Sequence, residues 1–307
     1  MSNSKSTNFD SCTSFFIENG VYQGRLIRLH NVVNTILGKH CYPKPVAAVV
    51  AECTALGAML ASQLKYDGLF TLQIQSNGVV NLVVVDVTSD GKIRACARYD
   101  EDRLQHAQEL RKTEGEIEAT PHLLGGGNLA FTVDQGENTE LYQGIVDLQG
   151  KNLAECALRY FKQSEQIDTD LKLFVQAPEG ESSSWSVAGI MLQKMPSQGS
   201  ELTAEEQAET WNEAKVFMQS LSENEVFDSS LSSEDLLIRL FHGNSLQITN
   251  ARNYTFGCRC SREKLLNTLQ TFSQEDIDSM IENNQVSASC NFCGEKYVFT
   301  PGELHKQ

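Results

Sequence analysis

The sequence has little positive charge. Its 307 residues include 25 Lys and Arg against 40 Asp and Glu, so the formal net charge at pH 7 is −15. A protein that binds nucleic acid phosphates without sequence preference needs clustered Lys and Arg, and docking on an anionic membrane needs them too. The composition therefore argues against nucleic acid and membrane partners. With 40% apolar and 21% charged residues, we expect a soluble globular chain of two domains, or one domain with an appendage.

The sequence also lacks a secretory signal and a convincing membrane span. Residues 1–8 are polar and rich in Ser, with no apolar core. The one membrane-like stretch, residues 46–64, is rich in Ala and contains Glu52, and an acid at mid-bilayer costs about 2.5–3.5 kcal/mol. A buried amphipathic helix is the better interpretation. The nine cysteines are an odd number and do not resemble a secreted disulfide framework, so we predict a protein of the reducing cytoplasm.

Common catalytic signatures are missing as well. The run Gly125-Gly126-Gly127 lacks the Lys and the Ser or Thr of a phosphate-binding loop. None of the six histidines stands in a recognisable pairing with a nucleophile. We therefore predict that the protein is not an enzyme and assign no catalytic residue.

The first 196 residues have the pattern of an α+β domain. Asn77-Gly78 and Ser89-Asp90-Gly91 mark tight turns between the first three strand patterns, which predicts an antiparallel meander. Runs of strands with separate helices favour an antiparallel-sheet core with packed helices over a doubly wound parallel sheet. Helical patterns cover residues 29–38, 45–65 and 152–163, and strand patterns cover 69–74, 79–87, 92–99, 128–134, 142–148, 172–176 and 185–194.

The composition changes after residue 196. Residues 199–244 contain ten acids and two bases, so they carry −8 of the net −15. Thr203 and Glu206 match a capping box, and Ser232 or Ser233 can cap a second helix. These helices are too apolar for a solvated linker, with Trp211, Phe217, Met218, Leu236, Leu237, Ile238, Leu240 and Phe241. Two interpretations are open: a helical hairpin packed on its neighbours, or an apolar face that is covered in one state and exposed in another.

Four of the nine cysteines form two tight pairs near the C-terminus. Cys258 and Cys260 are followed by 29 residues and then by Cys290 and Cys293, and Gly294 allows a tight turn after the second pair. Four thiolates from two short loops suit tetrahedral zinc. A module of about 45 residues is too small to be stabilised by core burial alone, so the metal would supply folding free energy. Ser261 and Ser273 can cap helices between the pairs. The other cysteines are predicted to be unpaired thiols: Cys12, Cys41, Cys53, Cys96 and Cys156.

The spacing leaves the permanence of the site open. Zinc-bound cysteines are thiolates, the oxidisable form, and cysteines two or three positions apart can also close into disulfides after modest backbone movement. Such oxidation would remove about 10–16 kcal/mol of apparent metal-binding free energy and unfold the module. The alternative is a constitutive structural zinc ribbon, an adaptor that binds one folded partner through the acidic helical hairpin.

Segments beyond the cysteines resemble the bacterial 33 kDa heat-shock family, the redox-regulated holdase chaperones. The resemblance extends over about residues 19–299. It rests on LVVVDVTSDG at 82–91, YQGIV at 142–146 followed by LAEC at 153–156, YFKQSEQ at 160–166, LFH at 240–242 and FGCRCS at 256–261.

This resemblance implies three parts. Residues 1–196 would be an α+β core domain for substrate binding and dimerisation, residues 197–257 an acidic helical linker, and residues 258–307 a C-terminal four-cysteine zinc redox-switch module.

The resemblance also implies a mechanism. In the inactive reduced form, one zinc ion would be bound by Cys258, Cys260, Cys290 and Cys293. On oxidation Cys258 would pair with Cys260 and Cys290 with Cys293, zinc would leave, and the module and linker would unfold. The oxidised form, a homodimer, would then hold unfolded or partially unfolded client proteins without ATP.

Overall fold

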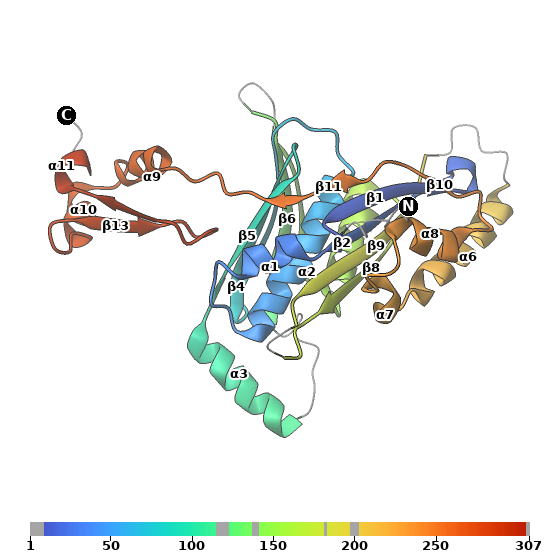
Figure 1. Ribbon diagram of the computed structural model, residues 1–307, viewed down its shortest axis with the longest axis horizontal. Helices are drawn as coiled ribbons and strands as arrows, with labels where there is room; N and C mark the ends of the chain where they lie inside the picture. The colour runs from blue at the N-terminus through green and yellow to red at the C-terminus, as the bar shows by residue number, and fades with distance from the viewer. Residues whose placement is uncertain (1–8, 115–122, 137–140, 181–182, 197–202, 305–307) are drawn as a thin grey trace, which may run out of the picture.

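The structure is a computed structural model that describes residues 9–114, 123–136, 141–180, 183–196 and 203–304. Residues 1–8, whose polarity predicts the absence of a signal peptide, lie outside the described residues. The architecture is α+β, as predicted, with two sheets, helices between and beside them, and a small C-terminal module (Figure 1).

Sheet A is antiparallel and has the strand order β10-β1-β2-β9-β8, with β11 also paired to β1. Its strands are β1 Ser11–Ile17, β2 Tyr22–Leu29, β8 Thr169–Gln176, β9 Ser186–Lys194, β10 Gln247–Ile248 and β11 Arg252–Asn253. A short helix, η1 (Glu18–Gly20), joins β1 to β2. No strand pattern in the sequence predicts β1 or β2. Nearly every residue of β2 and β9 is buried, because sheet A is covered on both faces, and such strands lack the polar alternation of a half-exposed strand.

Sheet B has the strand order β12-β5-β4-β3-β6-β7 and is antiparallel except for β12, which runs parallel to β5. The predicted meander is confirmed, since β3, β4 and β5 are successive neighbours in the sheet. The strands are β3 Leu69–Ser76, β4 Val80–Thr88, β5 Lys92–Tyr99, β6 Gly127–Asp134, β7 Tyr142–Asp147 and β12 Thr255–Phe256. Helix α3 (Glu101–Glu114), which follows β5, was not predicted.

Helix α2 (Lys44–Ala61) lies between the two sheets, beside α1 (Asn31–Leu37) (Figure 1). A Cβ at Gly57 would be only 3.0 Å from Val85 of β4, and one at Gly189 of β9 would be 3.3 Å from Met59. Within the described residues, α2 alone has the length and hydropathy of a membrane span, but 83% of it is buried inside the protein. The predicted burial is confirmed. The helix is buried on nearly every side and is not amphipathic, because a sheet covers it from each direction. Helix α5 (Leu153–Tyr160), continued by η2 (Phe161–Glu165), packs near β7 and β8.

The linker helices cover the outer face of sheet A, the face turned away from α2 (Figure 1). They are α6 Ala204–Ser220, α7 Glu223–Val226 and α8 Ser233–Phe241. Both expected caps are present, the Thr203–Glu206 capping box and Ser232 at the start of α8. One apolar cluster joins the helices to the sheet, with Trp211, Ala214, Met218, Leu221, Val226, Leu236, Leu237 and Phe241 facing Phe15, Ile17, Tyr22, Leu26, Phe174, Ala188, Ile190 and Leu192.

Polar anchors fix the position of the linker on this cluster. The guanidinium of Arg28, which is completely buried, donates to the backbone carbonyls of Leu231 at 2.6 Å and Asp228 at 2.7 Å. Burial lowers the pKa of Arg28 to about 10, so the side chain remains cationic at neutral pH. Tyr22 Oη donates to the carbonyl of Gln207 at 2.7 Å.

The C-terminal module lies on the other side of the core from the linker helices, beyond β5 (Figure 1). It contains α9 Arg262–Leu269, α10 Gln274–Ser279, β13 Val286–Ser289, β14 Lys296–Phe299 and α11 Pro301–Leu304. Ser261 and Ser273 cap α9 and α10, as predicted. The buried cluster of the module is small, with Leu269, Ile277, Val286, Phe299 and Leu304. Between linker and module, β10 and β11 pair with β1 of sheet A and β12 pairs with β5 of sheet B.

We expect Arg28→Met to release the linker from sheet A. The variant would leave the carbonyls of Asp228 and Leu231, two partly buried residues, without their donor. A fully buried unpaired group costs about 1–3 kcal/mol, which is the upper limit for each carbonyl. Limited proteolysis of the linker should accelerate, and the emission of Trp211, buried against Tyr22, should shift to longer wavelength in a Trp185→Phe background.

The matched control is Arg98→Met, which changes an exposed arginine and should leave both readouts unchanged. Hydrogen exchange of α2 reports whether the core stays folded. A docked, protease-resistant linker in Arg28→Met would show that the apolar cluster and the remaining hydrogen bonds hold the linker without Arg28.

Candidate metal centre

The structure brings the four C-terminal cysteines into one cluster. All four Sγ atoms lie within 4.8 Å of one another, with Cys258 and Cys290 3.6 Å apart and Cys260 and Cys293 3.5 Å apart. Tetrahedral zinc with Zn–S bonds of about 2.3 Å separates its sulfurs by about 3.8 Å. The donor set and spacing therefore fit a zinc ion. All four cysteines are free and partly buried.

Each pair of cysteines is presented by a short, well-defined loop. Cys258 and Cys260 lie between β12 and the start of α9. The second pair lies in the turn between β13 and β14, where Gly294 N donates to Cys290 O at 2.8 Å and Cys290 N donates to Glu295 O at 2.9 Å. Gly294 adopts a φ of 72°, a conformation that glycine tolerates without strain. The predicted tight turn is therefore confirmed.

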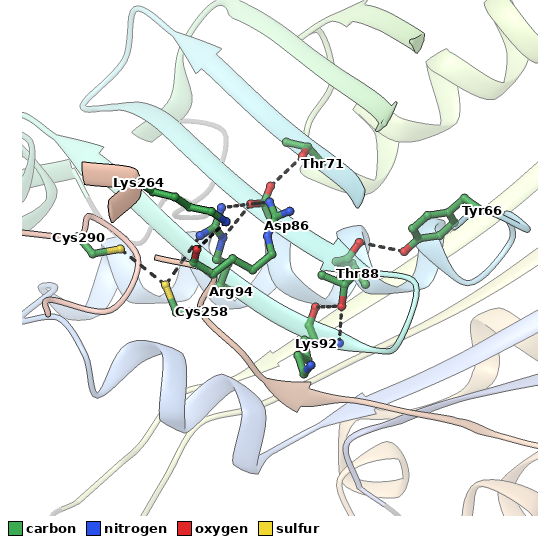
Figure 2. Close-up of polar contacts among 11 residues, drawn as sticks. Tyr66, Thr71, Asp86, Thr88, Lys92, Arg94, Cys258, Lys264 and Cys290 are labelled. Atoms are coloured by element: carbon green, nitrogen blue, oxygen red, sulfur yellow. Dashed lines mark hydrogen bonds and ion pairs between the residues drawn. The ribbon is translucent and has the colours of Figure 1, made fainter. Parts of the chain in front are cut away.

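The core domain contributes a side chain to this cluster. Arg94 of β5 donates from Nη1 to Cys258 Sγ at 3.8 Å (Figure 2). Its guanidinium also stacks on the ring of Phe292, 3.9 Å from the ring centroid. Asp86 of β4 forms an ion pair with the same guanidinium at 2.6 Å. From within the module, Tyr297 Oη donates to Cys260 Sγ at 3.4 Å.

These neighbours give the sulfurs unequal proton affinities. Partial burial opposes ionisation of Cys258, but hydrogen bonds from the Cys260 backbone and side chain, Arg94 and Cys293 outweigh it and lower the pKa to about 7. Burial and the adjacent sulfurs raise the pKa of Cys293 to about 12. A bound cation must displace protons from such a site, because thiolates are the ligand form.

The other five cysteines lie outside the cluster. Cys12, Cys53, Cys96 and Cys156 are buried and Cys41 is exposed, and all are free. Burial raises the pKa of Cys96 to about 11, so it stays protonated at neutral pH. The prediction of unpaired thiols is confirmed.

No motif in the sequence marks Arg94 or Asp86 as neighbours of the cysteine cluster. The turn at Ser89-Asp90-Gly91 places these residues opposite each other in the β4–β5 register. The predicted hairpin was therefore sufficient to predict the ion pair between them. The contact with Cys258 could not be predicted in this way, because it depends on how the module docks against the core.

Comparisons with known proteins agree over nearly the whole chain. The family model described as Hsp33 protein matches residues 10–300. A 33 kDa chaperonin of Caulobacter vibrioides strain NA1000 is 33% identical over 294 residues, or 95% of each chain. One of Pseudomonas fluorescens strain Pf-5 is 32% identical over 297 residues, covering 96% of this chain and 92% of the relative. The crystal structure of the 33 kDa chaperonin of Thermotoga maritima has the same fold, with a TM-score of 0.76, 19% identity and 97% of both chains covered.

We expect Cys258→Ser to abolish tight zinc binding, because three thiolates and a hydroxyl no longer form the four-thiolate set. Elemental analysis of protein purified without chelators should give about one zinc per wild-type chain, as one tetrahedral site requires, and almost none for the variant. Cys156→Ser, which changes a buried thiol outside the cluster, should retain the wild-type zinc content. Equal zinc in Cys258→Ser would mean that the cluster is not the metal site.

Proposed function

Because the chain belongs to the Hsp33 family, whose members are chaperones and not enzymes, we propose that it is a redox-regulated holdase of the cytoplasm that works without ATP. Oxidation would switch it from a closed, reduced form to an open form that holds unfolding or oxidatively damaged proteins and prevents their aggregation.

The observation that carries this proposal is the apolar outer face of sheet A beneath the linker. Phe15, Leu26 and Ile190 are completely buried there, and they lie in the one cluster that the sheet shares with the linker helices. If the linker leaves, both the sheet and the helices present this apolar surface to solvent. A contiguous exposed surface of this kind binds apolar segments of other proteins.

The sensor would be the four-cysteine cluster. In the reduced form Cys258, Cys260, Cys290 and Cys293 would hold one zinc ion, which supplies folding free energy to a module with a small core. Oxidation by peroxide would join Cys258 to Cys260 and Cys290 to Cys293. For each pair, two thiolates lose two electrons, an S–S bond forms, the O–O bond of one hydrogen peroxide breaks, and two hydroxide ions are released. Sulfurs in disulfides are no longer thiolate ligands, so the module would lose both its metal and its fold.

The effector would be the linker. Residues 197–257 connect the module, residues 258–307, to the core domain, residues 1–196. Loss of the folded module would remove the C-terminal attachment of the linker, which would then separate from sheet A. Residues 199–244 carry a charge of −8, and this charge would keep the released segment soluble. The open form would be a homodimer. It would bind unfolded or partially unfolded client proteins.

The proposal predicts an order of events under oxidation. Zinc release, followed with a chromogenic chelator, should precede suppression of client aggregation, followed by light scattering, when the reduced protein is treated with peroxide at raised temperature. The reduced protein alone should suppress little aggregation, because the linker covers the apolar face of sheet A.

Cys156→Ser is the control, and it should match the wild type in both signals. A protein that keeps its zinc under peroxide, or loses zinc without gaining chaperone activity, would contradict the switch. The metal would then be structural, and a constitutive zinc-ribbon adaptor that binds a folded partner would take its place.

A further inference from the structure

Arg94 touches both loops of the cysteine cluster from the core domain. Nη1 donates to Cys258 Sγ in the first loop at 3.8 Å, and the guanidinium plane stacks on Phe292, between the two cysteines of the second loop, at 3.9 Å from the ring centroid. Only 13% of the Arg94 side chain is exposed. A single guanidinium therefore contacts the first pair directly and the second pair through the ring that separates them.

Asp86 fixes the position of this guanidinium. Its Oδ2 accepts from Arg94 Nε at 2.8 Å and from Nη2 at 2.6 Å, while its Oδ1 accepts from Thr71 Oγ1 at 2.7 Å (Figure 2). The same Oδ2 also pairs with Arg259 Nη2 at 3.3 Å. Arg259 stands between Cys258 and Cys260, so one buried carboxylate links an arginine of the core to an arginine of the module.

Further contacts hold the module against the same edge of sheet B. The ring nitrogen Nε2 of His40 is 3.2 Å from the carbonyl oxygen of Phe292. Strand β12 pairs in parallel with β5, with Thr255 opposite Lys92 and Phe256 opposite Ile93. The cluster is thus supported by core residues on the side where Arg94 lies.

Four thiolates around one zinc ion carry a net charge of about −2, and a guanidinium that donates to one sulfur stabilises that charge. A donated hydrogen bond also withdraws electron density from the sulfur and makes it a weaker nucleophile. Groups that contact metal ligands in this way commonly change metal affinity by about 10–100-fold when they are removed.

On the basis of the proposed function, we propose that Arg94 is a positioning residue of the redox switch. From the core domain, it orients Cys258, stabilises the metal-loaded thiolates and keeps the reduced module docked on sheet B. The amount of oxidant needed for release of the metal is therefore set in part by a residue of the core, outside the module that senses the oxidant.

The test uses the full-length protein loaded with cobalt(II), which reports on its thiolate ligands through a charge-transfer absorption band. In Arg94→Met this band should shift, because Cys258 loses its hydrogen bond, and a competing chelator should remove the metal at least about tenfold more readily. Peroxide should release the metal faster by a similar factor. Arg94→Lys keeps the charge but loses the planar fork and the stacking, so its values should lie between those of the wild type and Arg94→Met.

Two further variants separate this role from a purely structural one. Arg98→Met changes an exposed arginine on the same face of β5 and should match the wild type. The double variant Asp86→Asn, Arg94→Met neutralises the buried carboxylate that loses the Arg94 guanidinium in the single variant. Its core should stay folded by hydrogen exchange of α2, and the metal should still be released faster.

The proposal is overturned if Arg94→Met has the wild-type band and release rate, or if the double variant restores them. A wild-type chain that binds no cobalt or zinc would instead refute the proposed function itself. The two failures are therefore distinguishable.

Discussion

The outer face of sheet A has to be covered, and much of the chain is organised by that constraint. Its inner face packs on α2, while Phe15, Leu26 and Ile190 on the outer face are fully buried beneath the linker helices. A sheet that is apolar on both faces is stable in water only when a second layer covers each face. The linker helices are that second layer, so the packing of sheet A depends on a segment that follows it in the chain, residues 203–241.

The structure of the linker is compatible with the proposed release from sheet A. Its helices are capped by Thr203, Ser222 and Ser232, each paired with an acid three residues on. These local bonds stabilise the helix ends independently of sheet A. The acids that give residues 199–244 a charge of −8 would keep the segment hydrated if it left sheet A. Attachment to the core comes from the apolar cluster and from a few donors, such as Arg28 and Tyr22, that bind backbone carbonyls.

Local signals in the sequence were enough for several elements with one exposed face, although not for α3. The meander β3-β4-β5, the capping boxes and the turn at Gly294 all follow from short-range chemistry, and the Hsp33 match confirms the family resemblance. Strands β1 and β2 were missed because burial on both faces erases their alternation. Helix α2 was correctly expected to be buried, but its burial on nearly every side was not, because the second sheet that covers it could not be foreseen. The contact of Arg94 with Cys258 joins residues 164 positions apart, and no local pattern predicts it.

The position of the cysteine cluster raises the question of how it could affect a linker on the opposite side of the core. A short stretch of chain connects the linker helices to the module. It contains three strands of two residues each: β10 and β11 pair with sheet A, and β12 pairs with sheet B. Arg252 donates to the carbonyls of Thr88 and Ser89, and Tyr254 donates to that of Ala58, so this segment is tied to the rigid core between its two partners. Backbone bonds from Thr249 N to Ser14 O and from Gly257 N to Ile93 O hold the two ends of this segment on the core as well. Going back along the chain from the module, β12 is followed by β11 and β10 and then by α8, the last of the linker helices, so these contacts lie between the cysteine cluster and the covered face of sheet A.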